Sequence, residues 1–137
     1  MYKFEKLEVW NIALDYLDRM YSIAGALPDS EAFNLTAQLR RAATSIALNI
    51  AEGSTGQTNA EQSRFLGMAL RSLMETVACL QIIRRRGYIE DSSALDAGYQ
   101  QSQILARKLH AFRQALSPGK ARLRENLEEY GNEFGEE

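Results

Sequence analysis

LTAQLRRAATSIALNIAEG, residues 35–53, is the stretch of the sequence that decides the fold. Its apolar residues recur every three or four positions, and this spacing places them on one face of an α-helix. They are Leu35, Leu39, Ala42, Ile46 and Ile50. Gly53 suits the left-handed conformation that often follows a helix C-terminus, so we expect the helix to end there.

The same spacing predicts three more helices, over about residues 6–26, 60–86 and 92–116. Four amphipathic helices with connections of roughly 5 to 10 residues predict an all-α fold, an antiparallel up-down-up-down four-helix bundle over residues 1–117. The acidic tail, residues 118–137, repeats apolar residues at Leu123, Leu127 and Tyr130. We expect this tail to be disordered or partly helical, with a short fifth helix.

Helical-wheel positions also predict which side chains face the core. In the first helix Tyr21 belongs to the buried face, whereas Val9 and Tyr16 lie beside it and are expected to be exposed. In the third helix Cys79 lies opposite the buried stripe. In the fourth helix we expect Tyr99 to be buried.

The composition supports a single helical domain of 137 residues. There are 18 alanines and 17 leucines but only two valines, and strands favour β-branched residues. No apolar run reaches the roughly 18 residues of a membrane span, and the opening residues lack the apolar stretch of a signal peptide. We therefore expect a cytoplasmic protein that does not contact a membrane.

The supply of reactive side chains argues against an enzyme. Zinc sites need several Cys or His ligands, and a Ser-His-Asp triad needs a histidine close to a nucleophile. The sequence has one cysteine, Cys79, and one histidine, His110, which we expect to be a solvated surface residue. We therefore predict no catalytic residue, no metal, no cofactor and no small-molecule substrate.

The helix over residues 35–53 carries a narrow polar stripe beside its apolar face. The stripe consists of Gln38, Arg41, Ser45, Asn49 and Glu52. These side chains suit a hydrogen-bonded polar seam between helices or subunits. The other interpretation is a catalytic carboxylate at Glu52. It is less favoured because structural ion pairs perturb carboxylates in the same way as catalytic sites do.

The third helix has apolar residues, Met68, Cys79 and Ile82, among charged ones on its outer face. Mixed surfaces of this kind are typical of oligomer interfaces. We therefore predict an oligomer interface formed by Arg64, Met68, Arg71 and Glu75.

The sequence resembles a known family of four-helix bundles, the 23S rRNA intervening-sequence proteins. The resemblance runs from about residue 4 to residue 116 and is most specific within residues 38–53. Its most specific residues are Gln38, Arg40, Arg41, Ala42, Ser45, Ile46, Asn49, Ile50, Ala51, Glu52 and Gly53. The family is related to the accessory variability determinant of diversity-generating retroelements, a basic pentamer that binds a reverse transcriptase and nucleic acid.

The resemblance implies a homopentamer, whose partner would be nucleic acid or a nucleic-acid enzyme. The charge pattern gives mixed support for such a partner. Residues 32–117 carry a net charge of +4, which suits nucleic acid, but the segments on either side carry −3 each. The candidate nucleic-acid-binding residues are Arg40, Arg41, Arg84, Arg85, Arg86, Arg107 and Lys108. The alternative is a protein-binding adaptor or scaffold with no nucleic-acid role.

Overall fold

The computed structural model describes residues 1–56 and 58–118. The structure has four α-helices: α1 (Glu8–Gly25), α2 (Leu35–Ser54), α3 (Asn59–Arg86) and α4 (Ser93–Leu116). Two short 3-10 helices, η1 (Lys3–Lys6) and η2 (Asp29–Glu31), precede α1 and α2, and there is no strand in the described ranges. The predicted all-α four-helix bundle is confirmed. The predicted fifth helix and its residues Leu123, Leu127 and Tyr130 fall outside the described residues.

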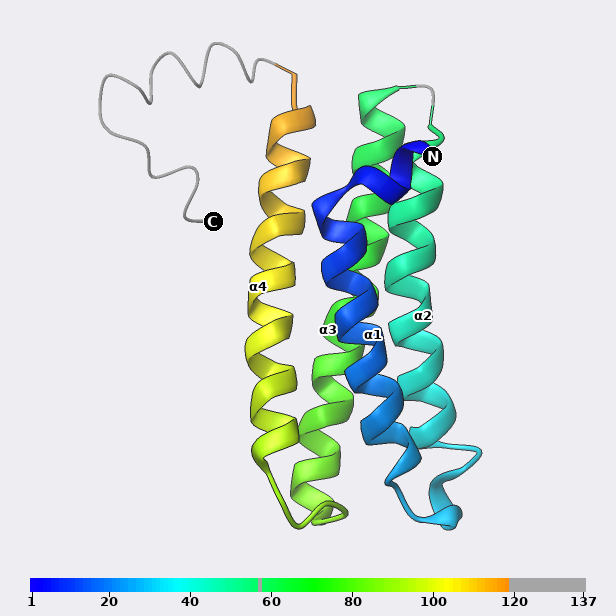
Figure 1. Cartoon of the computed structure of the whole chain (residues 1–137), viewed down its shortest axis with the longest axis vertical. Helices are drawn as coiled ribbons and strands as arrows, with labels where there is room; N and C mark the ends of the chain where they lie inside the picture. The colour runs from blue at the N-terminus through cyan, green and yellow to red at the C-terminus, as the bar shows by residue number, and fades with distance from the viewer. Residues whose placement is uncertain (57, 119–137) are drawn as a thin grey trace, which may run out of the picture.

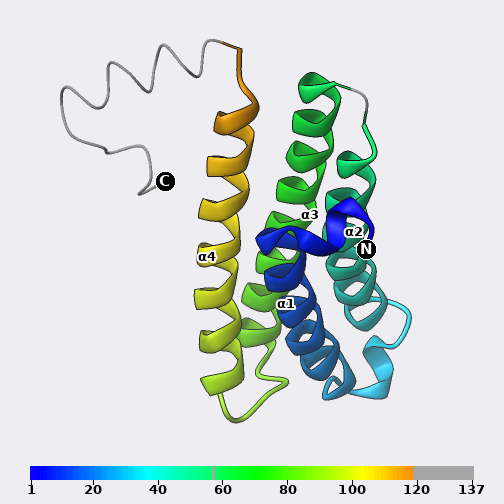
Figure 2. The same cartoon turned by 45° about the horizontal axis from the view of Figure 1, so that its top comes forward.

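The helices pack as a square, because α1 and α3 each contact both α2 and α4. Consecutive helices run in opposite directions in Figure 1, so the N-terminus and the end of α4 lie at the same end of the bundle. Figure 2 shows η1 crossing that end of α1, where it also packs against α2. The square arrangement leaves α1 and α3 on one diagonal and α2 and α4 on the other.

The connection between α2 and α3 is short, and α3 starts and stops at clear signals. The Thr58 hydroxyl caps α3 by accepting a hydrogen bond from the Glu61 backbone N–H at 3.1 Å. Gly87 ends α3 with a φ of +68°, the one positive φ among the described residues. The expectation of a left-handed Gly53 is therefore wrong, and α2 continues to Ser54.

Gly53 has a different role, which is to let α3 approach α2. A Cβ atom at Gly53 would lie 2.9 Å from the Cβ of Phe65 and 3.4 Å from the backbone oxygen of Gln62. The first distance is shorter than real Cβ contacts, so a side chain here would force the two helices apart. Close packing of α2 on α3 thus depends on glycine at this position.

The core fills the space between all four helices, and several expectations about it are wrong. Val9 and Tyr16 are buried rather than exposed, whereas Tyr21 and Tyr99 are each 41% exposed. The Tyr16 hydroxyl can be buried because it is hydrogen-bonded to the Thr76 hydroxyl, 2.7 Å away. The largest fully buried side chains are Tyr16, Met20, Leu39, Ile46, Ile50, Leu66, Leu73, Ile83, Leu95, Leu105, Leu109 and Thr76.

Cys79 is also buried, although it was expected on the outer face of the third helix. It shares a groove with Leu35 and Gln38 of α2, so it lies on the side of α3 that faces α2. Burial, followed by the nearby charge of Glu75, raises the pKa of its thiol. A thiol in this setting stays protonated at neutral pH and is a poor nucleophile.

By length and composition alone, α3 could cross a membrane. The same property is expected of a helix that packs in the core of a bundle, and part of α3 is buried between α2 and α4. Packing in the bundle thus accounts for part of the apolar composition of α3.

Candidate functional site

The predicted polar stripe of α2 meets α3 at its centre. The hydroxyl oxygens of Ser45 and Ser72 lie 2.9 Å apart, and this hydrogen bond joins α2 to α3. The Asn49 amide donates to the backbone oxygen of Ser45 at 2.9 Å and to its hydroxyl at 3.1 Å. Ser72 was not among the predicted residues, because only the packing of α3 on α2 places it opposite Ser45.

The other members of the stripe take no part in this network. The side chains of Gln38, Arg41 and Glu52 form no hydrogen bond with Ser45, Asn49 or any other described residue. Glu52 is exposed and close enough to α3 for its charge to act on Arg64. Hydrogen bonding and charge from Glu61 raise the pKa of Arg64, and the charge of Glu52 contributes further.

The predicted interface residues lie on the exposed side of α3. Arg64 is held locally, because its guanidinium forms an ion pair with Glu61 at 2.7 Å and lies 4.6 Å from the ring centre of Phe65. Met68 is 38% exposed, and Arg64 donates to its sulfur at 3.6 Å. Arg71 and Glu75 are exposed, and neither forms an ion pair within residues 1–56 and 58–118.

Two further apolar residues extend this exposed side of α3. Ile82, which the sequence places on the outer face of this helix, is 48% exposed, and Met74 is 53% exposed. Neither was among the four residues predicted to form the interface. The helical spacing of residues 64, 68, 71, 75 and 82 was the signal that could have added Ile82. Together they make an exposed stripe in which apolar and charged side chains alternate.

The polar stripe and the exposed side of α3 form one continuous surface. Gln38 of α2 and Glu75 and Ile82 of α3 line the same groove, which has a volume of about 490 Å³. We call this surface the α2–α3 face. It comprises Gln38, Ser45, Asn49 and Glu52 of α2 with Arg64, Met68, Arg71, Glu75 and Ile82 of α3.

One end of the α2–α3 face is fixed by a contact between two connections. The Tyr88 hydroxyl donates to Glu31 at 2.6 Å, and Arg86 Nε donates to the Tyr88 hydroxyl at 3.3 Å. The Tyr88 hydrogen bond, with a second one from Asn34, lowers the pKa of Glu31 below its ordinary value. The η2 segment is thereby held to the segment that follows α3.

Three of the seven candidate nucleic-acid-binding residues already have protein partners. Arg84 forms an ion pair with Asp96 at 2.5 Å, and Lys108 forms one with Glu8 at 2.9 Å. Arg86 makes the Tyr88 contact described above. Their charges are therefore partly neutralised or held within the bundle.

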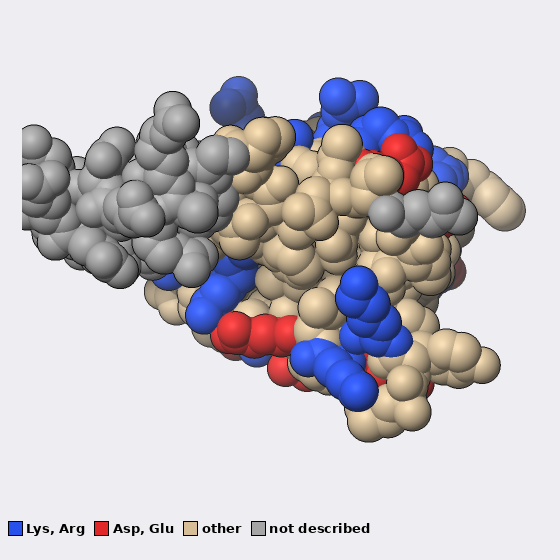
Figure 3. All heavy atoms as spheres, turned by 90° about the horizontal axis from the view of Figure 1, so that it is seen from above, with Lys and Arg blue, Asp and Glu red and all other residues tan. Residues whose placement is uncertain are grey.

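The other four candidates are exposed and lie on three different helices. Arg40 lies 5.7 Å from the ring centre of Tyr21, on the side of α2 that faces α1. Arg41, Arg85 and Arg107 have no ion pair with a described residue. Viewed from above, Lys and Arg side chains form separate groups on opposite sides of the molecule, with Asp and Glu among them (Figure 3). One subunit thus presents no single basic patch in this view.

The described residues contain no group of three or more His, Cys, Asp or Glu side chains suited to a metal ion. His110 is exposed on α4.

Comparison with protein families gives a match to the model described as 23S rRNA-intervening sequence protein, over residues 5–111. That range includes α1, α2, α3 and most of α4. No curated protein matches the chain.

Proposed function

Because the chain belongs to the 23S rRNA-intervening sequence protein family, we propose that it is a non-catalytic scaffold that assembles as a homo-oligomer, a pentamer, in the cytoplasm. The α2–α3 face is one of the two surfaces through which each subunit contacts its neighbours. The observation that carries this proposal is the row of exposed Met68, Arg71, Glu75 and Ile82 on α3.

The exposed stripe has the composition of an interface rather than of a solvated helix face. A helix on the outside of a monomeric bundle normally presents polar residues to water, whereas interface cores favour Met, Arg and apolar side chains. Met68 and Ile82 fit that composition. Burying them against a neighbour would remove their apolar surface from water, at about 25 cal/mol per Å².

Charge complementarity supplies the second argument. A closed ring needs two different contact surfaces on each subunit, because each copy meets two neighbours through unlike patches. Arg71 has no ion pair with a described residue of its own subunit, and exposed Asp15 and Asp18 of α1 offer carboxylates on another side of the bundle. A contact between α3 of one copy and α1 of the next would pair these charges.

The assembly is tested by gel filtration with light scattering. We expect a mass of about five times 15.4 kDa. Met68→Glu combined with Ile82→Glu should give smaller species, because both changes place charge inside the contact. Ile104→Glu is the matched control, since Ile104 is 43% exposed on α4, away from the α2–α3 face. A wild-type monomer at micromolar concentration would contradict the proposal.

A role as a nucleic-acid-associated accessory protein is the second candidate. It is favoured by Arg40, Arg41, Arg85 and Arg107, which have no ion pair with a described residue. Repetition of these residues around a ring would add phosphate contacts that one subunit lacks. If nucleic acid does not bind, the scaffold instead serves as a protein-binding adaptor, with several copies of one surface strengthening weak contacts.

A further inference from the structure

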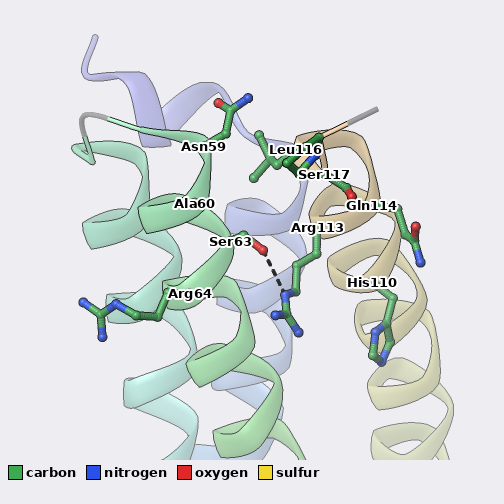
Figure 4. Close-up of a pocket in the computed structure, with 10 residues that line it drawn as sticks. Asn59, Ala60, Ser63, Arg64, His110, Arg113, Gln114, Leu116 and Ser117 are labelled. Carbon is green, nitrogen blue, oxygen red and sulfur yellow. Dashed lines mark hydrogen bonds between the residues drawn. The ribbon is translucent and has the colours of Figure 1, made fainter. Parts of the chain in front are cut away.

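An open cavity of about 720 Å³ lies between the first turns of α3 and the last turns of α4. Figure 4 shows Asn59 and Ser63 on the α3 side and His110, Arg113 and Gln114 on the α4 side. Pro118, the last described residue, also lines it. The cavity shares only Arg64 with the α2–α3 face, and the exposed Met68, Arg71, Glu75 and Ile82 that carry the proposed assembly do not line it. None of the candidate nucleic-acid-binding residues lines it either.

Arg113 is the central charged group of this cavity. Its side chain is half-buried, and its Nε donates to the Ser63 hydroxyl at 3.3 Å. The guanidinium lies against the backbone of α3 at Gly67, where an added Cβ would be 3.2 Å from Cζ and 3.4 Å from each terminal nitrogen. Glycine at residue 67 thus provides the space that the guanidinium occupies.

The cavity lacks a counter-ion for Arg113 among the residues that the structure describes. No described Asp or Glu lines it, and Arg113 forms no ion pair with a described residue. The Arg64 guanidinium points away from Arg113 and His110 in Figure 4. A half-buried guanidinium is stabilised by an anion that accepts hydrogen bonds from both terminal nitrogens, and a carboxylate has the matching geometry.

We propose that this cavity binds carboxylates of the chain's own segment 125–137, ENLEEYGNEFGEE. The segment contains six glutamates and no basic residue, so its charge is opposite to that of Arg113. It follows Pro118, at the rim of the cavity, after a link of six residues, 119–124. A link of that length spans up to roughly 20 Å, which is ample for a carboxylate to reach the guanidinium.

This contact would hold the end of α4 against the start of α3. It goes beyond the proposed assembly, since it lies within one subunit and does not require a pentamer. The bound segment would also exclude other anions from the cavity. A phosphate-bearing ligand would therefore have to displace it to reach Arg113.

Hydrogen–deuterium exchange measured by mass spectrometry on the full chain tests the proposal. We expect replacement of all six glutamates of residues 125–137 by glutamine to speed exchange in peptides covering residues 59–67 and 107–117, by roughly fivefold for one charge-assisted contact. Arg113→Gln should produce the same increase. Combining the two changes should add nothing further, because both remove the same contact.

Two controls keep the result specific. Arg107→Gln removes an exposed arginine of α4 that does not line the cavity, and it should leave the response to the glutamate changes intact. Mixed oligomers of the Arg113→Gln chain and the glutamine-tail chain should show no restored protection. Restored protection would assign the contact to a neighbouring subunit and overturn the proposal.

Other outcomes would also overturn it. One is that glutamine replacement leaves the exchange of both peptides unchanged. Another is that single-stranded RNA, and not the acidic segment, protects the two peptides in an Arg113-dependent way. The cavity would then be a phosphate site.

Discussion

The Tyr16 hydroxyl of α1 and the Thr76 hydroxyl of α3 are hydrogen-bonded at 2.7 Å across the diagonal of the bundle. Thr76 also donates its single hydroxyl proton to the backbone oxygen of Leu73 at 2.6 Å. Tyr16 must therefore be the donor to Thr76. Burial raises the pKa of Tyr16 to about 12, so the phenol keeps this proton at neutral pH.

The direction of that hydrogen bond predicts unequal effects of the two single substitutions. Tyr16→Phe removes the donor and leaves Thr76 bonded to Leu73, so we expect a loss of about 1 kcal/mol of unfolding free energy. Thr76→Val leaves a buried phenol without an acceptor and should cost about 1–3 kcal/mol. Urea denaturation at one fixed protein concentration measures both, and the double variant should cost less than the sum. Equal losses from the two single variants would contradict the assigned direction.

Substitution of glycine by alanine should have opposite effects in α2 and α1. Gly53→Ala places a Cβ at 2.9 Å from the Phe65 Cβ, and we expect a loss of about 1–3 kcal/mol despite the better helix propensity of alanine. Gly25→Ala is the matched control, because its nearest neighbour is the Arg40 side chain at 4.0 Å. There the gain in helix propensity, up to about 1 kcal/mol, should raise the melting temperature. A stabilised Gly53→Ala variant would show that α2 and α3 can separate without cost.

The contact between Tyr88 and Glu31 predicts that the difference in stability between the wild type and the Glu31→Gln variant depends on pH. The folded state lowers the pKa of Glu31 from its ordinary 4.5, so the stability that this contact contributes is present above pH 4.5 and is lost as the pH falls through the folded pKa. Glu31→Gln should therefore be less stable than the wild type at pH 7, and the two chains should converge in acid. Thermal melts between pH 3 and pH 7 measure this, with Glu90→Gln, an exposed residue near Tyr88, as the control. A constant difference over that range would exclude the ionised carboxylate as the cause.

If nucleic acid binds, arginines without an ion pair should contribute more than those with one. Replacement of Arg40, Arg41 and Arg85 by alanine should lower the slope of log affinity against log salt, by about 0.9 for each duplex phosphate that is no longer neutralised. Arg84→Ala with Lys108→Ala should change it less, because Asp96 and Glu8 already pair with those residues. Titration of labelled RNA and DNA duplexes at about 50 and 200 mM salt provides the measurement. Equal effects of the two sets would contradict this prediction, whereas no binding at the lower salt would leave the adaptor role in place.

The sequence predicted the helices well because helix formation depends on local spacing and end signals. The periodic apolar residues of α2 and the Gly87 stop of α3 are properties of neighbouring residues. Gly53 was misinterpreted because the same residue serves at helix ends and at close helix contacts. Only the position of Phe65 on another helix distinguishes the two.

The candidate site was less predictable because its contacts join distant parts of the chain. Ser45 was identified from its place in the polar stripe, but its partner Ser72 lies on another helix. The ion pair between Lys108 and Glu8 likewise links α4 to α1, and no local pattern reveals it. Tyr16 was assigned to the surface because a wheel of one helix does not show which neighbours it faces.

The four helix pairs in contact form a closed cycle, since α4 packs on α1 although no connection joins them. The beginning of the chain and the end of α4 lie at the same end of the bundle (Figure 1). The order of the helices along the chain is therefore not what specifies their packing. A circularly permuted chain, with a linker from residue 118 to residue 1 and new termini in the connection between α3 and α4, would keep every helix beside the same two neighbours.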